Sequence, residues 1–181
     1  MKKIFLTLMV MVAAVAANAQ VWVGGSLGFW NNGDAEGYEQ IKTSLEIAPE
    51  IGYDLSEDWS IAIGLEYALA KPDKGDDVYG IGVNPYVRYN LLKAGNFKFF
   101  LDGGFEIAAI DTGADDNYSA WGIGIKPGIA YSLNEKFSLV GHLGFLGYQD
   151  CDDEIVDLSL IQKGFGLNLS NNISFGVYYA F

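Results

Sequence analysis

The last eighteen residues, 164–181, alternate between two kinds of side chain, and this alternation constrains the fold most. The odd positions carry Phe, Leu, Ile, Val and Tyr, interrupted only at Asn171, whereas the even positions carry Gly, Asn, Ser, Tyr and Ala. A period of two is that of a β-strand, because successive side chains point to opposite faces of a sheet. The chain therefore ends in a strand that has one apolar face.

Seven earlier segments show the same alternation, so we predict eight strands. They span residues 21–30, 42–53, 59–70, 79–91, 97–109, 120–133, 137–147 and 164–181. A turn at Asn171 and Asn172 would divide the last segment and give nine. We favour eight, because the alternation continues through Asn171 and bacterial single-chain barrels have even strand numbers. The first part of this long strand then projects outward beside the end of segment 137–147.

The two faces of these segments differ sharply in charge. The odd, apolar phase comprises 53 positions and none is charged. A lipid-facing Arg or Lys at the middle of a membrane costs about 2–4 kcal/mol, which explains so strict a separation. A soluble β-sandwich also alternates, but it does not need a second face so rich in Gly, Ala and Ser, whereas a narrow barrel lumen does. We predict an all-β protein, a transmembrane up-and-down antiparallel β-barrel of eight strands.

The predicted connections alternate in length. Those after the second, fourth and sixth strands are short, and those after the first, third, fifth and seventh are long. Outer-membrane barrels have short periplasmic turns and long external loops, so both ends of the barrel chain are expected on the periplasmic side. A proline recurs in equivalent positions of three strands, Pro49, Pro85 and Pro127, and suggests a built-in bulge near one rim.

Aromatic residues gather at both ends of the predicted strands, as they do at the two interfaces of a membrane barrel. The expected periplasmic girdle contains Tyr53, Trp59, Tyr89, Phe97, Tyr131, Phe137, Tyr179 and Phe181. The expected outer girdle contains Phe29, Trp30, Tyr67, Tyr79, Tyr118, Trp121 and Tyr148.

Residues 1–19 are expected to be a cleaved signal peptide, which leaves residues 20–181 as the barrel domain. Lys2 and Lys3 precede an uncharged apolar run, and Ala17-Asn18-Ala19 forms an A-x-A cleavage site. Without Lys2 and Lys3, 9 basic residues remain against 23 acidic ones, a net charge of −14. That charge excludes a nucleic-acid binder.

The whole of 20–181 resembles the small eight-stranded outer-membrane β-barrels of Gram-negative bacteria, the OmpA/OmpX-like barrels. The resemblance rests on the signal peptide, the strands, the connection lengths and the ending FGVYYAF. It implies that Phe175, Val177, Tyr179 and Phe181 form a signal read by the barrel-assembly machinery. It implies a monomer in the outer membrane, in contact with lipid and lipopolysaccharide. The family's roles include adhesion, envelope integrity, small pores and occasional lipid enzymes.

The charged residues on the opposite phase are candidates for an interior network. They are Glu46, Glu50, Glu66, Arg88, Lys98, Asp102, Glu106 and Lys126. Buried charges must be compensated by partners, and eight strands leave room only for side chains. We therefore expect a plugged polar lumen, with a narrow porin-like channel as the alternative.

Other chemistry is weakly supported, so we predict no enzyme, no catalytic residue, no metal site and no cofactor. His142 is the only histidine; it shares a face with Ser138, but no motif makes this pair a lipid hydrolase. The acidic neighbours of Cys151 should raise the pKa of its thiol. The long connections are rich in Asp and Glu, which could hold divalent cations. A secreted soluble lipocalin-like binding protein remains an alternative class.

Overall fold

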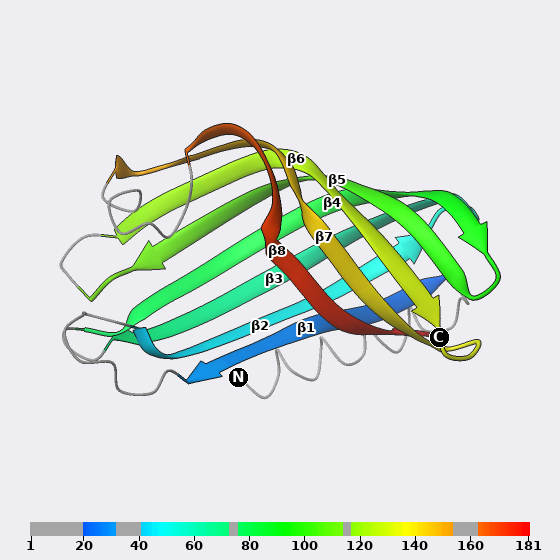
Figure 1. Ribbon diagram of the computed structural model, residues 1–181, viewed down its shortest axis with the longest axis horizontal. Coiled ribbons are helices and arrows are strands. Elements are labelled where there is room, and N and C mark those ends of the chain that lie inside the picture. The colour runs from blue at the N-terminus through cyan, green and yellow to red at the C-terminus, as the bar shows by residue number, and fades with distance from the viewer. Residues whose placement is uncertain (1–19, 32–40, 73–75, 114–116, 154–162) are drawn as a thin grey trace, which may run out of the picture.

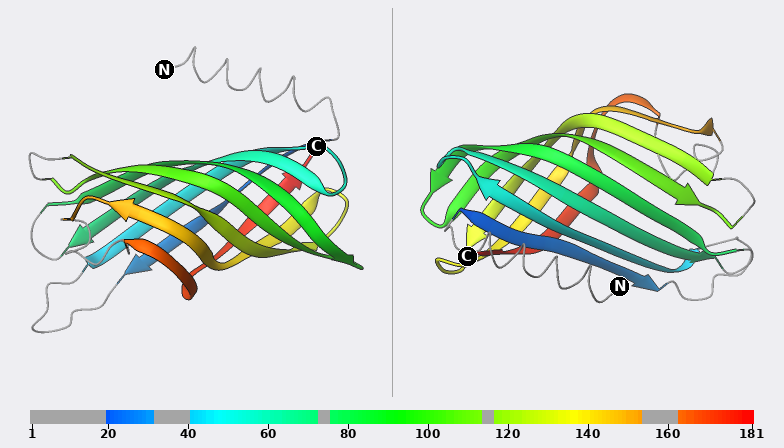
Figure 2. Two further views of the ribbon diagram at one scale, coloured as in Figure 1. Left: turned by 90° about the horizontal axis from the view of Figure 1, so that it is seen from above. Right: turned by 180° about the vertical axis from the view of Figure 1, so that it is seen from behind.

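The structure of the protein is a computed structural model that describes residues 20–31, 41–72, 76–113, 117–153 and 163–181. Its strands are β1 (Val21–Asn31), β2 (Ile41–Asp54), β3 (Trp59–Pro72), β4 (Val78–Ala94), β5 (Phe97–Asp111), β6 (Asn117–Ser132), β7 (Phe137–Cys151) and β8 (Gly164–Ala180). They form one closed antiparallel barrel in sequence order, in which β8 returns to β1 (Figure 1 and Figure 2). The predicted eight-stranded barrel is confirmed, and residues 164–181 do not divide into two strands. The expected signal peptide lies outside the described residues.

The outer surface of the barrel carries the apolar phase that the alternation predicts. Ile81, Ile107 and Ile123, from β4, β5 and β6, are each more than half exposed there. The charged phase turns toward the lumen, where Arg88 and Asp102 are buried. A lipocalin-like barrel would place its apolar phase inside, so the arrangement here is the inverse. Within the described residues, no helix is both long and apolar enough to cross a membrane.

The two ends of the barrel differ, and we name them by their connections. The short-turn end holds the β2–β3, β4–β5 and β6–β7 turns and the C-terminus, and the long-loop end holds the other connections (Figure 1). Each turn is built locally: the Leu55 N–H donates to the Trp59 carbonyl at 2.8 Å, and Asn134 Oδ1 accepts from the Phe137 N–H at 2.9 Å. Gly95, at φ 60°, supplies the left-handed residue of the β4–β5 turn.

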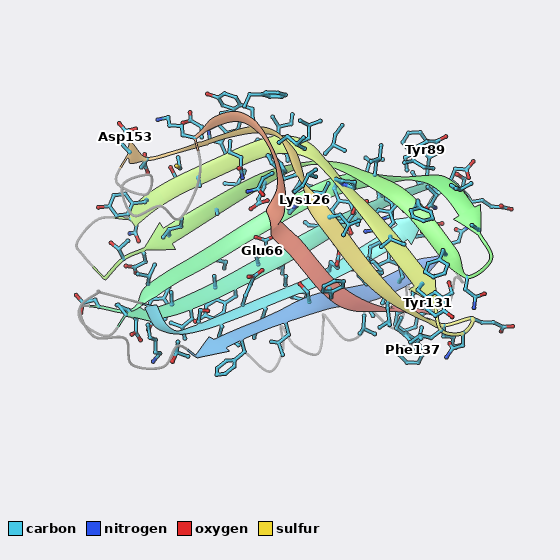
Figure 3. The ribbon with its side chains drawn as sticks, in the orientation of Figure 1. Glu66, Tyr89, Lys126, Tyr131, Phe137 and Asp153 are labelled. Carbon is cyan, nitrogen blue, oxygen red and sulfur yellow. The ribbon has the colours of Figure 1, made fainter. Side chains whose placement is uncertain are left out.

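Aromatic girdles surround both ends. At the short-turn end, Trp59 lies against Tyr89 and Phe97 against Tyr131, with ring centroids 4.6 and 4.8 Å apart. Figure 3 labels Tyr89, Tyr131 and Phe137 at this end. At the long-loop end, Trp121 contacts Phe105 and Tyr148. Among the expected members whose side chains are described, Tyr118 is misplaced: it packs inward against a buried cluster around Ile110, because it belongs to the even phase of β6. The side chain of Trp30 lies outside the described residues.

The three prolines interrupt the ladder on one side of each strand. Pro49, Pro85 and Pro127 keep their partners Gly25, Ile63 and Leu101 on the preceding strand. On the following strand the pairing skips each proline, since proline has no N–H to donate. Only the interruption at Pro127 shifts the register. The expected bulge is therefore found once, and it lies inside the strand and not near a rim.

The facing of β7 departs from the prediction beyond Gly144. Between Ile125/Leu146 and Gly128/His142, β7 contains one more residue than β6, which is a β-bulge. Gly144, at φ 88°, occupies the left-handed region within this bulge. The extra residue reverses the two faces: Phe145 is 6% exposed and points inward, whereas Leu146, 38% exposed, points outward. The expectation that odd positions of 137–147 all face outward is therefore wrong for Phe145 and Gly147.

A second irregularity lies directly across from Gly144, on β8. Leu143 pairs with Ile173, but Phe145 pairs with Asn168, so β8 contains three residues more than β7 between these pairs. The pairing does not continue evenly through Asn171 as the alternation suggested. The long-loop part of β8 nevertheless pairs with the end of β7, from Gly164/Gln149 onward, as expected.

Candidate functional site

An ion pair buried inside the short-turn half of the lumen joins β4 to β5. Arg88 Nε and Nη2 donate to the two carboxylate oxygens of Asp102 at 2.7 and 2.8 Å. Arg88 is 6% exposed and Asp102 4%. The two residues are register partners, so the ladder itself brings the fork of the guanidinium to the carboxylate. His142 Nε2, from β7, reaches the same carboxylate at 2.9 Å.

Two tyrosines extend this network to the other side of the barrel. The hydroxyl groups of Tyr86 and Tyr178 donate to the carboxylate of Glu50, the latter at 2.6 Å. Arg88 also donates to the Tyr178 hydroxyl at 3.2 Å. The network thus connects β2, β4, β5, β7 and β8 across the lumen. Among the described side chains, no buried polar atom lacks a hydrogen-bond partner.

Aromatic rings fill the rest of this section of the lumen. The Arg88 guanidinium carbon lies 3.9 Å from the centre of the Phe100 ring, and Trp22 stacks on Tyr178 with centroids 4.6 Å apart. Trp22, Phe100 and Tyr178 form one buried cluster with Ala130 and Val140. We call this set of side chains, together with Arg88 and Asp102, the plug. Its members interlock across the lumen at the short-turn half.

Above the plug, toward the long-loop end, the inward positions are small and a cavity remains. Its volume is about 320 Å³. Glu46, Glu66, Glu106 and Lys126 line it, and Lys126 Nζ donates to Glu106 Oε2 at 3.2 Å. Figure 3 labels Glu66 and Lys126 near the middle of the barrel. Glycines on β3, β5 and β6 leave this space open, for no side chain projects from them.

At the long-loop end, the inner side of β5, β6 and β7 is apolar. Ile110, Ala120 and Cys151 are buried together, with Tyr118 packed against them. Burial raises the pKa of the Cys151 thiol, and the nearby Lys163 ammonium opposes this shift. The acidic neighbours raise this pKa as predicted, and each of them has a smaller effect than burial. Burial is thus the largest cause of the raised thiol pKa, and it was not predicted from the sequence.

The structure places seven of the eight predicted network residues on the lumen side in two groups. Arg88, Asp102 and Glu50 belong with the plug, and Glu46, Glu66, Glu106 and Lys126 line the cavity. Lys98 is exposed at the short-turn end, and no ion pair joins it to a described residue. Four aromatic residues of the lumen were not predicted from the sequence, although an aromatic residue on a phase of small side chains was a usable signal: Trp22, Tyr86, Phe100 and Tyr178.

His142 acts as a structural partner in this geometry. The hydrogen bond that the structure gives its Nε2 runs to Asp102, and its ring meets Phe100 edge-on at 5.5 Å. Ser138 does not share a hydrogen bond with it among the described contacts. A hydrolase triad needs its histidine bonded to the nucleophile, and the described contacts of His142 do not include one with Ser138.

Acidic residues at the long-loop end are partly paired with lysines. Lys163 Nζ lies 3.0 Å from Asp153 and 3.2 Å from Asp150, and these hydrogen bonds raise the pKa of its ammonium. Lys71 Nζ lies 3.1 Å from Asp77. In the part of the chain that the structure describes, no group of three His, Cys, Asp or Glu residues could hold a metal ion. Other acidic loop residues, Asp34, Glu36, Glu39, Asp73, Asp115, Asp116 and Glu154, lie outside the described residues.

The predicted assembly signal closes the barrel. Phe175 and Val177 project from the outer surface of β8. Tyr179 lies between Phe137 and Phe181, with ring centroids 5.0 and 5.1 Å away. The Phe181 N–H donates to the Val21 carbonyl, which ties the last residue to the first strand. Three of these four positions carry aromatic rings, and Val177 carries methyl groups.

Comparisons with known proteins agree with this architecture. The family model described as outer membrane protein beta-barrel domain matches residues 4–181. Neisserial surface protein A is similar in structure, with a TM-score of 0.51 and 16% identity over 91% of this chain and 98% of that one. The outer membrane protein OprG from Pseudomonas aeruginosa has a TM-score of 0.48 and 10% identity over 90% and 92%. No curated protein matches the sequence.

Proposed function

This chain belongs to the outer membrane protein β-barrel family, and from that premise we propose that it is a non-conducting, non-enzymatic barrel with a structural or surface-interaction role. The observation that carries the proposal is the plug. Arg88 donates to Asp102 of the neighbouring β5 and to Tyr178 of β8. Its guanidinium carbon lies 3.9 Å from the centre of the Phe100 ring, so these side chains together span the lumen. An ion passing this section would have to displace a buried, fully bonded network.

The polarity of the barrel in the membrane follows from the connections. We place the short-turn end in the periplasm and the long-loop end outside, as in other outer-membrane barrels. The acidic side chains near the long loops, such as Asp150 and Asp153, then face the lipopolysaccharide and the medium. Divalent cations at these loops, the barrel-assembly machinery and a monomeric state stay predictions from the sequence.

Planar-bilayer recording tests the closed lumen. Wild-type protein should produce no conductance steps. The double variant Trp22→Ala/Phe100→Ala removes two large rings from the plug and should produce steps, because the remaining side chains cannot fill the section. Phe99→Ala is the matched control: its ring neighbours Phe100 in the sequence but lies on the outer surface. This control should stay silent, and steps from the wild-type barrel would instead support the narrow channel.

A further inference from the structure

The wall of the barrel is incomplete between its first and last strands. The β1–β8 ladder runs from Trp22/Ala180 to Ser26/Gly176. Beyond Ser26, β1 continues to Asn31 on β2, and β8 before Gly176 continues on β7, but no described pair joins β1 to β8 there. Figure 1 shows β8 bending away from β1 toward the long-loop end. We call this break the seam.

The irregularities described above produce the seam. At Gly144 the β7 strand bulges, and opposite it β8 contains three additional residues. Bulges bend a strand and increase its twist. The long-loop half of β8 therefore follows β7 and not β1, even though the short-turn half pairs with both.

An open seam in a membrane must be covered by something. Hydrocarbon offers no hydrogen bonds, so backbone groups at an unpaired edge favour a wetted or polar surface beside them. The cavity supplies such a surface here, because Ser26 of β1 and Ser174 of β8 both line it. Polar residues of the cavity lining therefore lie on both strands that border the seam.

A groove on the lipid-facing side lies over the last β1–β8 pairs and the first residues of the seam. Its volume is about 530 Å³, and its lining is mostly apolar. One side of the groove is lined by Leu27 of β1 and Ile47 of β2. The other side is lined by Leu139 of β7 and by Phe175 and Val177 of β8. Ser26 lines both the groove and the cavity. An apolar exterior groove and a charged interior cavity therefore border the same residue.

The charge of the cavity selects the kind of head group that would enter it. Asp102 is neutralised by Arg88, and Glu50 accepts two tyrosine hydroxyl groups. Lys126 is the cation that lines the cavity, and it hydrogen-bonds Glu106. Glu66 shares a hydrogen bond with Glu106 and interacts electrostatically with Glu46 and the same lysine. In the described part of the chain no ion pair joins Glu46 or Glu66 to a cation, so the cavity carries an excess of carboxylate.

We propose that the cavity binds the cationic head group of a single-chain amphiphile from the outer leaflet, whose apolar chain lies in the groove and passes through the seam. A protonated amine would donate to Glu46 and Glu66, and the chain would contact Leu27 and Phe175. The ligand enters laterally and stops at the plug. This site is independent of whether the barrel conducts, so the bilayer recordings and the binding test can succeed or fail separately.

Retention of labelled dodecylamine by the full-length barrel in phosphatidylcholine nanodiscs tests the proposal. At about pH 7 the alkylamine is charged, as lysine is, and it should bind saturably, one molecule per barrel, above empty nanodiscs. Labelled dodecanoate, which has a similar chain and the opposite charge, should be retained no better than by empty discs. Absence of saturable dodecylamine retention, or equal retention of dodecanoate, would overturn the proposed ligand class.

Two variants separate the head-group contact from the chain contact. Glu46→Gln/Glu66→Gln should weaken dodecylamine retention about tenfold or more, since hydrogen bonds to charged groups contribute roughly 1.5–3 kcal/mol. Glu57→Gln/Glu135→Gln removes two charges from the short-turn end and should have no effect. A heat-shift gel confirms that each variant is folded.

For the chain, Phe175→Ala should weaken retention severalfold. Phe165→Ala is its matched control, because Phe165 lies on the same strand with a similar exposure, 76% against 73%, but does not line the groove. Equal effects of the two phenylalanine variants would place the chain elsewhere and contradict the route through the seam. The phenylalanine pair also keeps the proposal falsifiable if the glutamine variant does not fold.

Discussion

The short-turn half and the long-loop half of this barrel use the same alternating pattern but reach opposite results inside. In the short-turn half β1 pairs with β8, and the inward positions include Trp22, Phe100 and Tyr178, which fill the lumen. In the long-loop half the β1–β8 pairing has ended, and inward glycines leave a charged cavity. Apolar alternation outside is therefore compatible with a solid interior or an open one. The inward side chains and the register decide which is formed.

The difference also affects how charges are compensated. The plug pair Arg88–Asp102 is almost wholly buried, whereas the side chains of the cavity pair Lys126–Glu106 are 32% and 29% exposed. Breaking a buried pair leaves an uncompensated charge, but water can solvate a partner in the cavity. The two halves should therefore respond very differently to removal of one charge.

The largest expected effect comes from Asp102→Ala in the plug. This change leaves the buried Arg88 guanidinium and His142 without their shared acceptor, and should lower the free energy of unfolding by about 3–5 kcal/mol. Urea titration of the folded band on a detergent gel measures the shift. Lys126→Gln, in the cavity, is the comparison and should cost less than about 1 kcal/mol. Similar losses for both variants would show that the two halves are equally buried.

An intermediate effect is expected from Gly144→Ala, at the boundary between the halves. The φ of 88° disfavours an L-residue by about 1–2 kcal/mol, and a Cβ there would lie 2.2 Å from the Asn168 carbonyl oxygen. The variant should lose stability by at least this amount and should alter dodecylamine retention by reshaping the seam. The control is Gly103→Ala, whose Cβ meets no atom within 4 Å. An unperturbed Gly144→Ala protein would mean that the bulge does not maintain the break.

The smallest effect concerns Cys151, at the long-loop end. Burial raises the pKa of its thiol, so the reactive thiolate is scarcer at mildly alkaline pH than in an ordinary cysteine. Alkylation by iodoacetamide should therefore be slow near pH 8 and should accelerate only as the pH rises further. Lys163 lowers this pKa, so Lys163→Ala should slow the reaction again. A cysteine placed at exposed Ser56 in a Cys151→Ser protein supplies the reference rate, and an equal rate for Cys151 would refute its burial.

Much of the fold was predictable because its signals are local. Alternation identified every strand within a few residues, and the absence of charge on the odd phase identified the lipid-facing side. The interior location of Glu46, Arg88 and Lys126 followed from the same phase. The reversal at Phe145 did not, since a bulge at Gly144 leaves no mark in a count of odd and even positions.

The candidate site was predictable as a set of residues but not as an arrangement. Phase alone placed Arg88, Asp102 and Glu66 in one network, whereas the ladder separates the first two from the third along the barrel axis. Lys98 shared their phase but is exposed at the short-turn end. Position along the axis depends on strand register, and register is set by pairing between strands.

The sequence by itself determined the class of fold, the strand number and the membrane-facing surface. Each of these is set position by position, according to whether a side chain faces the lipid or the lumen. A charge on the lipid-facing side has a large free-energy cost in any of the strands. Only the tertiary structure decided that Tyr178 meets Arg88, 90 residues away, and that β8 pairs with β1 only from Gly176 onward. Such contacts depend on the relative positions of distant strands. A few extra residues at Gly144 and opposite it on β8 shift these positions without changing the alternation.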